Sequence, residues 1–202
     1  MSLFDTDPGV NNSFPTDEKG CFDSSKYLKD LAAEISALPN PLIDQVSNVL
    51  ADAISDRKQI FFCGNGGSFA IAEHMVCDYA KGMKRFYSNG VLATNLGSNH
   101  PLNSALTNDF GHENAFMAEL QMYSREGDVL VAISSSGNSQ NILNCVHYAK
   151  QNNIKSIGLS GFGGGKLADL TDLGFVSKQD SYPAVEASHQ IFLDCVAFKL
   201  WK

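Results

Sequence analysis

Short apolar runs alternate with segments of helical periodicity over most of this 202-residue chain. Runs that are apolar throughout are typical of strands covered on both faces, as in parallel sheets. With right-handed crossovers through the intervening helices, this alternation predicts a doubly wound α/β fold. We expect the strands near Gln59–Cys63, Gly90–Thr94, Asp128–Ile133, Lys155–Ser160 and Leu173–Val176. We expect the helices near Ser68–Gly82, His100–Thr107, Glu113–Arg125, Ser139–Gln151, Lys166–Leu170 and Pro183–Trp201.

The N-terminal part of the chain follows a different pattern. Residues 1–20 are mostly polar and predict a flexible tail, whereas residues 21–202 predict one domain. Apolar residues recur at helical spacing over residues 23–55, but Pro39 and Pro41 interrupt them, which indicates two helices or one sharply bent helix. Together with the strongly apolar last helix, these segments offer more apolar surface than one sheet covers. The sequence does not decide whether this surface is buried in the core of one chain or at an interface between copies.

The charge and the cysteines exclude several classes of protein. A net charge of −7 argues against nucleic-acid binding and against adsorption to anionic membranes. The 5 cysteines are scattered, odd in number and without a CxxC pair, so we expect reduced thiols in a cytoplasmic protein. The sequence shows no signal-peptide pattern and no apolar stretch approaching the ~20 residues of a membrane span.

Two loops rich in glycine and hydroxyl side chains carry most of the functional information. Gly64–Ser68 follows the first predicted strand, and Ser134–Ser139 follows the third. Glycines let a ligand approach the backbone, while hydroxyls and the amides of a helix N-terminus hold an anion. Either loop alone would more often be a simple turn. At equivalent ends of parallel strands, the pair predicts a phosphorylated small molecule.

Two predicted helices carry polar residues at spacings that suit chemistry. His74 and Asp78 lie four residues apart and share a helix face. A second polar face, on the last helix, consists of Glu186, Gln190 and Asp194, with His189 beside it. If the two faces meet, the cleft could hold a divalent metal or support acid–base chemistry. The spacing alone favours solvated helix faces, but the apolar neighbours of Asp194 favour a buried role.

The order and spacing of these motifs resemble the sugar isomerase (SIS) domain family, and within it the phosphoheptose isomerase branch. The resemblance covers residues 25–202 and rests on Gly64–Ser68, Ala72–His74, Asn108–Gly111, Gly127–Leu130 and Ile133–Ser139. It implies a five-stranded parallel sheet flanked by helices and a homotetramer with sites at subunit interfaces. It also implies that sedoheptulose 7-phosphate is isomerised through an enediol to D-glycero-D-manno-heptose 7-phosphate. That product would supply heptose for lipopolysaccharide or capsule.

The resemblance also assigns residues. It implies phosphate contacts from Ser68, Ser134, Ser135, Ser136 and Ser139. It implies sugar contacts from Asn65, Gly66, Gly67, Asn99, Asn108, Asp109 and Glu186. The local sequence around Asn99, Asn108 and Asp109, taken alone, is more typical of turns and helix caps. It implies a zinc site made by His74, Asp78, Glu186 and Asp194.

Four positions depart from the pattern of the branch. Asp78 replaces a glutamate that is base and ligand, and Asp194 replaces a histidine that is acid and ligand. Glu186 replaces a glutamine ligand, and Asn99 replaces an aspartate. Aspartate is one methylene shorter than glutamate, and a misplacement of ~1 Å can cost ~100-fold in rate. Aspartate also lacks the near-neutral pKa of histidine.

All four predicted ligand positions nevertheless keep side chains able to bind a metal. The set is harder and more anionic, which predicts a retuned site that accepts zinc and tolerates Mn²⁺ or Fe²⁺. In this hypothesis Asp78 is the base, and Asp194 or a metal-bound water is the acid. The alternative is a non-catalytic phosphosugar-binding or regulatory protein, as in the DnaA initiator-associating protein of the same family. A third option is an isomerase or epimerase for another sugar phosphate.

Overall fold

The computed structural model describes residues 15–201; residues 1–14, most of the predicted tail, and residue 202 lie outside the described residues. One five-stranded sheet runs through the described part of the chain, with all its pairings parallel, in the order β2-β1-β3-β4-β5. The strands are β1 (Ile60–Gly64), β2 (Ala93–Asn95), β3 (Val129–Ile133), β4 (Lys155–Ser160) and β5 (Leu173–Val176). The predicted doubly wound parallel sheet is therefore confirmed.

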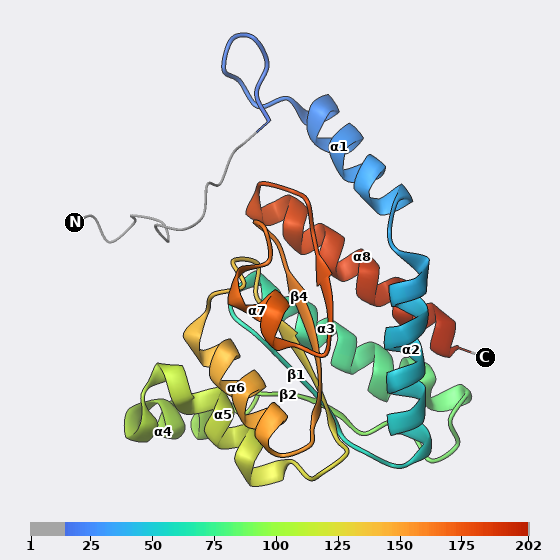
Figure 1. The fold of residues 1–202 in the computed structure, drawn as a ribbon, viewed down its shortest axis with the longest axis vertical. Helices are drawn as coiled ribbons and strands as arrows, with labels where there is room; N and C mark the ends of the chain where they lie inside the picture. The colour runs from blue at the N-terminus through green and yellow to red at the C-terminus, as the bar shows by residue number, and fades with distance from the viewer. Residues whose placement is uncertain (1–14, 202) are drawn as a thin grey trace.

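Helices cover both faces of this sheet (Figure 1). One layer packs Ile43, Met75 and Phe192 against the sheet, and the other packs Phe116, Ile142 and Leu167. The first layer is formed by α2 (Asn40–Ser55), α3 (Gly67–Ala80) and α8 (Tyr182–Leu200). The second is formed by α5 (His112–Tyr123), α6 (Gln140–Gln151) and α7 (Gly165–Leu170), with α4 (His100–Phe110) packed against α5. None of the described helices is long and apolar enough to cross a bilayer.

The N-terminal helical region consists of two separate helices, not one sharply bent helix; the prolines had left both open. Helix α1 (Ser24–Ser36) ends before Pro39, which caps α2, and Pro41 lies in the first turn of α2. Proline fits there because the first amides of a helix have no intrahelical partner. Helix α1 extends away from the sheet (Figure 1).

Several predicted boundaries differ from the structure by two or three residues. Helix α3 ends at Ala80, not at Gly82, and α4 ends at Phe110, not at Thr107. Strand β2 begins at Ala93, not near Gly90, because Gly90 has φ +69° and its amide closes a turn onto the carbonyl of Tyr87. Helix α5 ends at Tyr123, two residues early, because Ser124 adopts extended backbone angles. A short 3-10 helix, Gly82–Arg85, follows α3.

Candidate functional site

The register of the sheet brings the two glycine- and serine-rich loops together. Gly64, the last residue of β1, is the parallel partner of Ile133, the last residue of β3. Both strands therefore end at the same height, and the helices that follow begin side by side. A cavity of about 200 Å³ lies between them, lined by Asn65, Ser68, Ile133, Ser134, Ser135, Ser136, Ser139, Tyr182 and Glu186. Seven of these nine residues, all but Ile133 and Tyr182, were expected to contact the phosphate or the sugar.

The hydroxyl groups in this cavity are nearly all buried and only partly satisfied. Ser134 Oγ donates to Ser139 Oγ at 3.1 Å, and Ser136 Oγ accepts from the amide of Asn138 at 3.2 Å. Ser135 Oγ is buried without a hydrogen-bond partner among the described residues. A buried hydroxyl left unpaired is costly, and a phosphate oxygen would satisfy it. The N-termini of α3 and α6 add backbone amides and the positive ends of two helix dipoles.

Glycines shape the loop after β3. Gly137 has φ +64°, and a Cβ there would lie 2.0 Å from the carbonyl oxygen of Gly164. The Gly137 carbonyl also accepts from the amide of Leu167, and the Ser135 carbonyl accepts from the amide of Gly161. The loop after β4 and the start of α7 therefore support the serine loop.

Asn65 is held by a partner that the sequence did not identify. Its side-chain amide donates to Asn141 Oδ1 at 3.0 Å, and Asn141 returns a hydrogen bond to Asn65 Oδ1 at 2.8 Å. Asn141 is buried in the first turn of α6. A single polar residue near a helix start gives no local signal of such a role, because the pair joins α6 to the distant loop after β1.

Helices α3 and α8 bring three predicted metal ligands together. Ligand atoms of His74, Asp78 and Asp194 all lie within 4.8 Å of one another. His74 Nε2 lies 3.3 Å from Asp78 Oδ2. One imidazole and two carboxylates form a donor set suited to Zn²⁺, Mn²⁺ or Fe²⁺. The two helix faces singled out from the sequence do meet.

Gln190 supports this cluster from the middle of the same α8 face. Its side-chain amide donates to Asp194 Oδ1 at 2.7 Å and approaches Met75 Sδ at 3.4 Å. One oxygen of Asp194 is thereby fixed in orientation. Such supporting hydrogen bonds align metal ligands and tune their basicity.

Glu186, the fourth predicted ligand, faces the serine cavity and is not among the three clustered residues. A Cβ on Gly67 would lie 2.2 Å from Glu186 Oε2, so the carboxylate lies directly over the start of α3. Partial burial raises the pKa of Glu186. The structure therefore separates a three-residue cluster from one carboxylate beside the hydroxyls.

The remaining predicted residues lie on or beside α4. Asn99 caps this helix, since its Oδ1 accepts from the amide of Leu102 at 3.3 Å. Asn108 donates to Asp109 Oδ1 at 2.9 Å, and both side chains are exposed or half-buried. None of the three lines the serine cavity of this protomer.

Two further polar residues play structural parts near the site. His189 is fully buried, with Nε2 2.9 Å from the carbonyl oxygen of Ser160, and it does not join the clustered ligands. Glu73, beside His74, accepts from Asn95 at 2.9 Å and from Ser98, which ties α3 to the end of β2.

Comparison with known proteins agrees with this architecture. The model of the SIS domain matches residues 25–161. The chain therefore belongs to the SIS domain family, as its motifs predicted. Its similarity to phosphoheptose isomerases assigns it to that branch of the family.

The similar proteins cover most of the chain. The phosphoheptose isomerase of Geotalea daltonii is 34% identical over 164 residues, 81% of this chain and 83% of that protein. That of Helicobacter pylori (strain P12) is 30% identical over 159 residues, 77% of this chain and 82% of that protein. The solved phosphoheptose isomerase of Francisella tularensis has a TM-score of 0.80 at 23% identity, over 87% of this chain and 95% of that one. This likeness of structure confirms the predicted fold.

Proposed function

We propose that this protein is an aldose–ketose isomerase that interconverts sedoheptulose 7-phosphate and D-glycero-D-manno-heptose 7-phosphate. The observation that carries the proposal is the unpartnered Ser135 hydroxyl in a cavity at two helix N-termini. Such a cavity has the chemistry of a phosphate site. The relatives are named phosphoheptose isomerases, which supports a seven-carbon sugar phosphate as the substrate.

Phosphate binding is assigned to the hydroxyls of Ser68, Ser134, Ser135, Ser136 and Ser139 and to the amides that begin α3 and α6. Asn65, fixed by Asn141, is placed to hydrogen-bond a sugar hydroxyl. Glu186 faces the same cavity and can accept a hydrogen bond from the sugar. A substrate anchored by its phosphate would extend from the cavity toward the polar faces of α3 and α8.

Proton transfer between C1 and C2 is assigned to Asp78 and Asp194. Enediol chemistry needs a base near the carbon-bound proton and an acid near the carbonyl oxygen. Asp78 takes the first role, and Asp194, oriented by Gln190, takes the second. A divalent cation held by His74, Asp78 and Asp194 would supply positive charge to the oxygens of the substrate.

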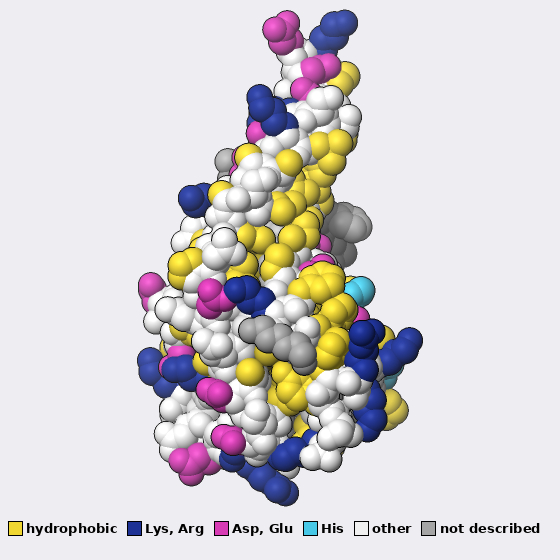
Figure 2. Space-filling model, turned by 90° about the vertical axis from the view of Figure 1, so that its right-hand side faces the viewer, with side chains coloured by type: hydrophobic (Ala, Val, Ile, Leu, Met, Phe, Trp, Pro, Cys, Tyr) yellow, Lys and Arg dark blue, Asp and Glu magenta, His cyan; other side chains and the backbone are white. Residues whose placement is uncertain are grey.

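A homotetramer is part of this proposal. Helix α1 has no buried residue in the isolated protomer, and Leu28 on it is 62% exposed. Figure 2 shows hydrophobic side chains gathered in a band on the side of the molecule where α1 and α2 lie. Covering this band with other copies would complete the core that one protomer leaves open. We propose that the enzyme acts in the cytoplasm, in the supply of heptose for surface polysaccharide.

One feature of the site favours the alternative of a non-catalytic phosphosugar-binding protein. Asp78 and Asp194 stand where the branch carries its glutamate base and histidine acid. Neither substitution affects the serine cavity, so binding without turnover is the specific competitor.

A turnover assay separates the two functions. The purified protein is incubated with sedoheptulose 7-phosphate, with and without Zn²⁺ or Mn²⁺, and formation of the aldose is followed. We expect turnover that is lost on chelation and restored by metal. Absence of turnover with any metal, together with thermal stabilisation by the sugar phosphate, would instead identify a binding protein.

A further inference from the structure

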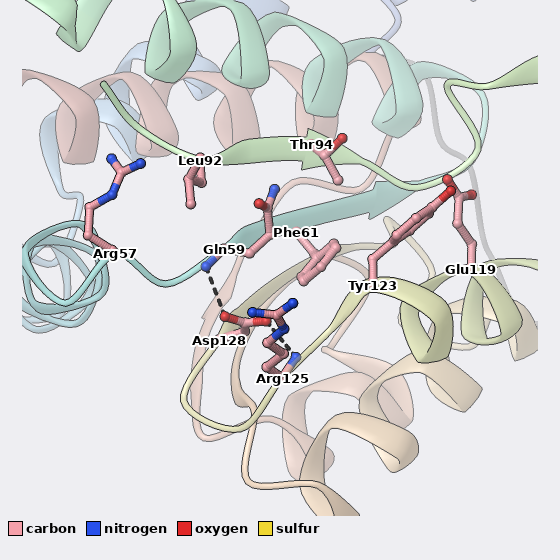
Figure 3. A pocket seen from close by; sticks show the side chains of 9 residues that line it. All are labelled: Arg57, Gln59, Phe61, Leu92, Thr94, Glu119, Tyr123, Arg125 and Asp128. Carbon is pink, nitrogen blue, oxygen red and sulfur yellow. Dashed lines mark hydrogen bonds between the residues drawn. The ribbon is translucent and has the colours of Figure 1, made fainter. Parts of the chain in front are cut away.

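A second cavity lies at the amino ends of the strands, at the end of the sheet opposite the serine cavity. Its volume is about 400 Å³. Gln59 and Phe61 line it from the start of β1, Leu92 and Thr94 from the start of β2, and Asp128 from the residue before β3 (Figure 3). It therefore opens at the amino ends of the strands, and none of its lining residues belongs to the site described above.

Two arginines line this cavity, and neither is paired with a carboxylate among the described residues. Arg57 Nη1 donates to the carbonyl oxygens of Asn89 and Gly90, both at 2.9 Å, which fixes the guanidinium. Its Nη2 and Nε have no hydrogen-bond partner among the described residues. The side chain of Arg125 makes no hydrogen bond or ion pair within residues 15–201. Unpaired guanidinium groups in a cavity favour an anionic ligand, phosphate above all.

The two acidic residues of the cavity accept hydrogen bonds from backbone amides and form no ion pair with either arginine among the described residues. Asp128 is buried. Each of its carboxylate oxygens accepts a hydrogen bond from a backbone amide, one from Gln59 at 2.9 Å and one from Arg125 at 2.7 Å (Figure 3). Glu119 is buried on α5 and accepts from the amide of Gly97 at 2.7 Å. Burial raises the pKa of Glu119, and the hydrogen bond from Gly97 opposes this shift.

The rest of the lining combines apolar, aromatic and uncharged polar side chains. Phe61 forms part of it, and the rings of Phe61 and Tyr123 both lie at the cavity in Figure 3. Tyr123 is 55% exposed and Leu92 40% exposed, more than is usual for side chains of this size. Gln59 and Thr94 add an amide and a hydroxyl able to hydrogen-bond the edge of a ring. A planar ring attached to an anionic group matches this combination.

We propose that this cavity is a binding site for a nucleoside monophosphate, separate from the isomerase site. The phosphate lies between Arg57 and Arg125, and the base lies against Tyr123 and Leu92, with its edge toward Gln59 and Thr94. The volume lies within the range of small-ligand pockets, about 300–1,000 Å³. The inference does not rest on the proposed isomerase activity.

Isothermal titration of the full chain with AMP, GMP, CMP and UMP tests the proposal. We expect at least one of them to bind with a Kd below about 1 mM. Arg125→Gln and Tyr123→Leu change exposed side chains, so both variants should fold, and each should weaken binding about tenfold or more. Lys29→Gln is the matched control for charge, because Lys29 is an exposed cation on α1, which lies at the other end of the molecule (Figure 1). It should leave the affinity unchanged.

Further arms locate the ligand. Ser135→Ala should not weaken the binding of the nucleotide. Adenosine and inorganic phosphate should each bind more weakly than AMP. The proposal is overturned if no nucleotide binds at concentrations up to roughly 10 mM. It is equally overturned if Arg125→Gln leaves the affinity intact, if inorganic phosphate binds as tightly as the nucleotides, or if Ser135→Ala abolishes binding.

Discussion

The hydroxyl of Ser135 shows how the fold prepares a ligand site at the scale of one residue. It is buried without a partner among the described residues, an arrangement that costs about 1–3 kcal/mol in a closed interior. Its neighbours Ser134 and Ser136 are satisfied by Ser139 and Asn138. The one unsatisfied hydroxyl of the loop is therefore the one most available to a phosphate oxygen.

Replacing Ser135 with alanine should weaken the binding of the sugar phosphate without destabilising the protein. The lost hydrogen bond to a charged oxygen is worth about 1.5–3 kcal/mol, which corresponds to a rise in Kd of about tenfold or more. The matched control is Ser124→Ala, because Ser124 Oγ is also buried and unpartnered but lies at the end of α5. Calorimetry with sedoheptulose 7-phosphate checks both variants. Equal affinities in the two would contradict the assignment.

Gln190 should contribute to metal affinity although it is not one of the clustered ligands. Its amide fixes Asp194 at 2.7 Å, and removing such a support lowers metal affinity by about 10–100-fold. We expect Gln190→Leu to show this loss in competition with a chromophoric chelator for Zn²⁺. Glu186→Gln is the control on the same helix face and should change the metal affinity little. The reverse order of effects would place the fourth ligand at Glu186.

His189 should make the protein less stable in mild acid. Burial lowers the pKa of His189 to about 4, against an ordinary value of 6.5, while the hydrogen bond to Ser160 and the charge of Glu34 oppose this shift. Between these two pKa values the unfolded chain binds a proton that the folded chain does not. Stability is therefore full above pH 6.5, falls as the pH drops below it, and levels off near pH 4.

Urea unfolding at pH 7.5 and pH 5 measures this effect. His189 should account for about 2 kcal/mol of the stability lost between these two values. His189→Gln keeps a donor for the Ser160 carbonyl, so its loss of stability over the same range should be smaller by that amount. An unchanged pH dependence would mean that His189 is not neutral in the fold.

At the scale of elements, two glycines that begin or precede helices should tolerate alanine very differently. A Cβ on Gly137 would meet the backbone of Gly164 at 2.0 Å, and φ is +64°. The atoms nearest to a Cβ on Gly67 belong to the carboxylate of Glu186, the end of a flexible side chain. We expect Gly137→Ala to cost about 2–4 kcal/mol in urea unfolding, and Gly67→Ala less than about 1 kcal/mol. Similar costs would contradict the packing of the serine loop on the loop after β4.

The elements show what local sequence could and could not predict. Strands β1 and β3 were predictable because each is apolar throughout and ends at a glycine or serine loop. The start of β2 was misplaced because Val91 and Leu92 resemble a strand, whereas the turn at Gly90 delays pairing to Ala93.

The candidate site shows the same division. Helical spacing identified the faces of α3 and α8 that meet at His74 and Asp194. The direction of the Glu186 side chain and the pairing of Asn65 with Asn141 depend on contacts between distant segments. No local pattern encodes such contacts, so these features needed the three-dimensional structure.

At the scale of the whole molecule, α1 is attached to its own protomer largely through polar contacts. Glu34 accepts hydrogen bonds from Ser177 Oγ at 3.1 Å, from Ser188 Oγ at 2.6 Å and from the amide of Lys178 at 2.6 Å. These contacts fix the end of the helix nearest the sheet. The apolar face of α1, which includes the exposed Leu28, is not covered by other parts of residues 15–201. Figure 2 shows hydrophobic side chains along this side of the molecule.

If copies of the chain cover that face, a charge placed on it should break the assembly without unfolding the protomer. Leu28→Asp introduces a carboxylate that burial between copies would leave unpaired, at a cost of several kcal/mol. Lys29→Asp introduces the same group one residue further on, at another exposed position of the helix. Light scattering coupled to gel filtration should show the unchanged protein and Lys29→Asp as tetramers and Leu28→Asp as smaller species. The resemblance to the family implies sites at subunit interfaces; on that hypothesis, turnover of Leu28→Asp should fall together with its mass. A tetramer that survives this substitution would mean that α1 lies outside the interface.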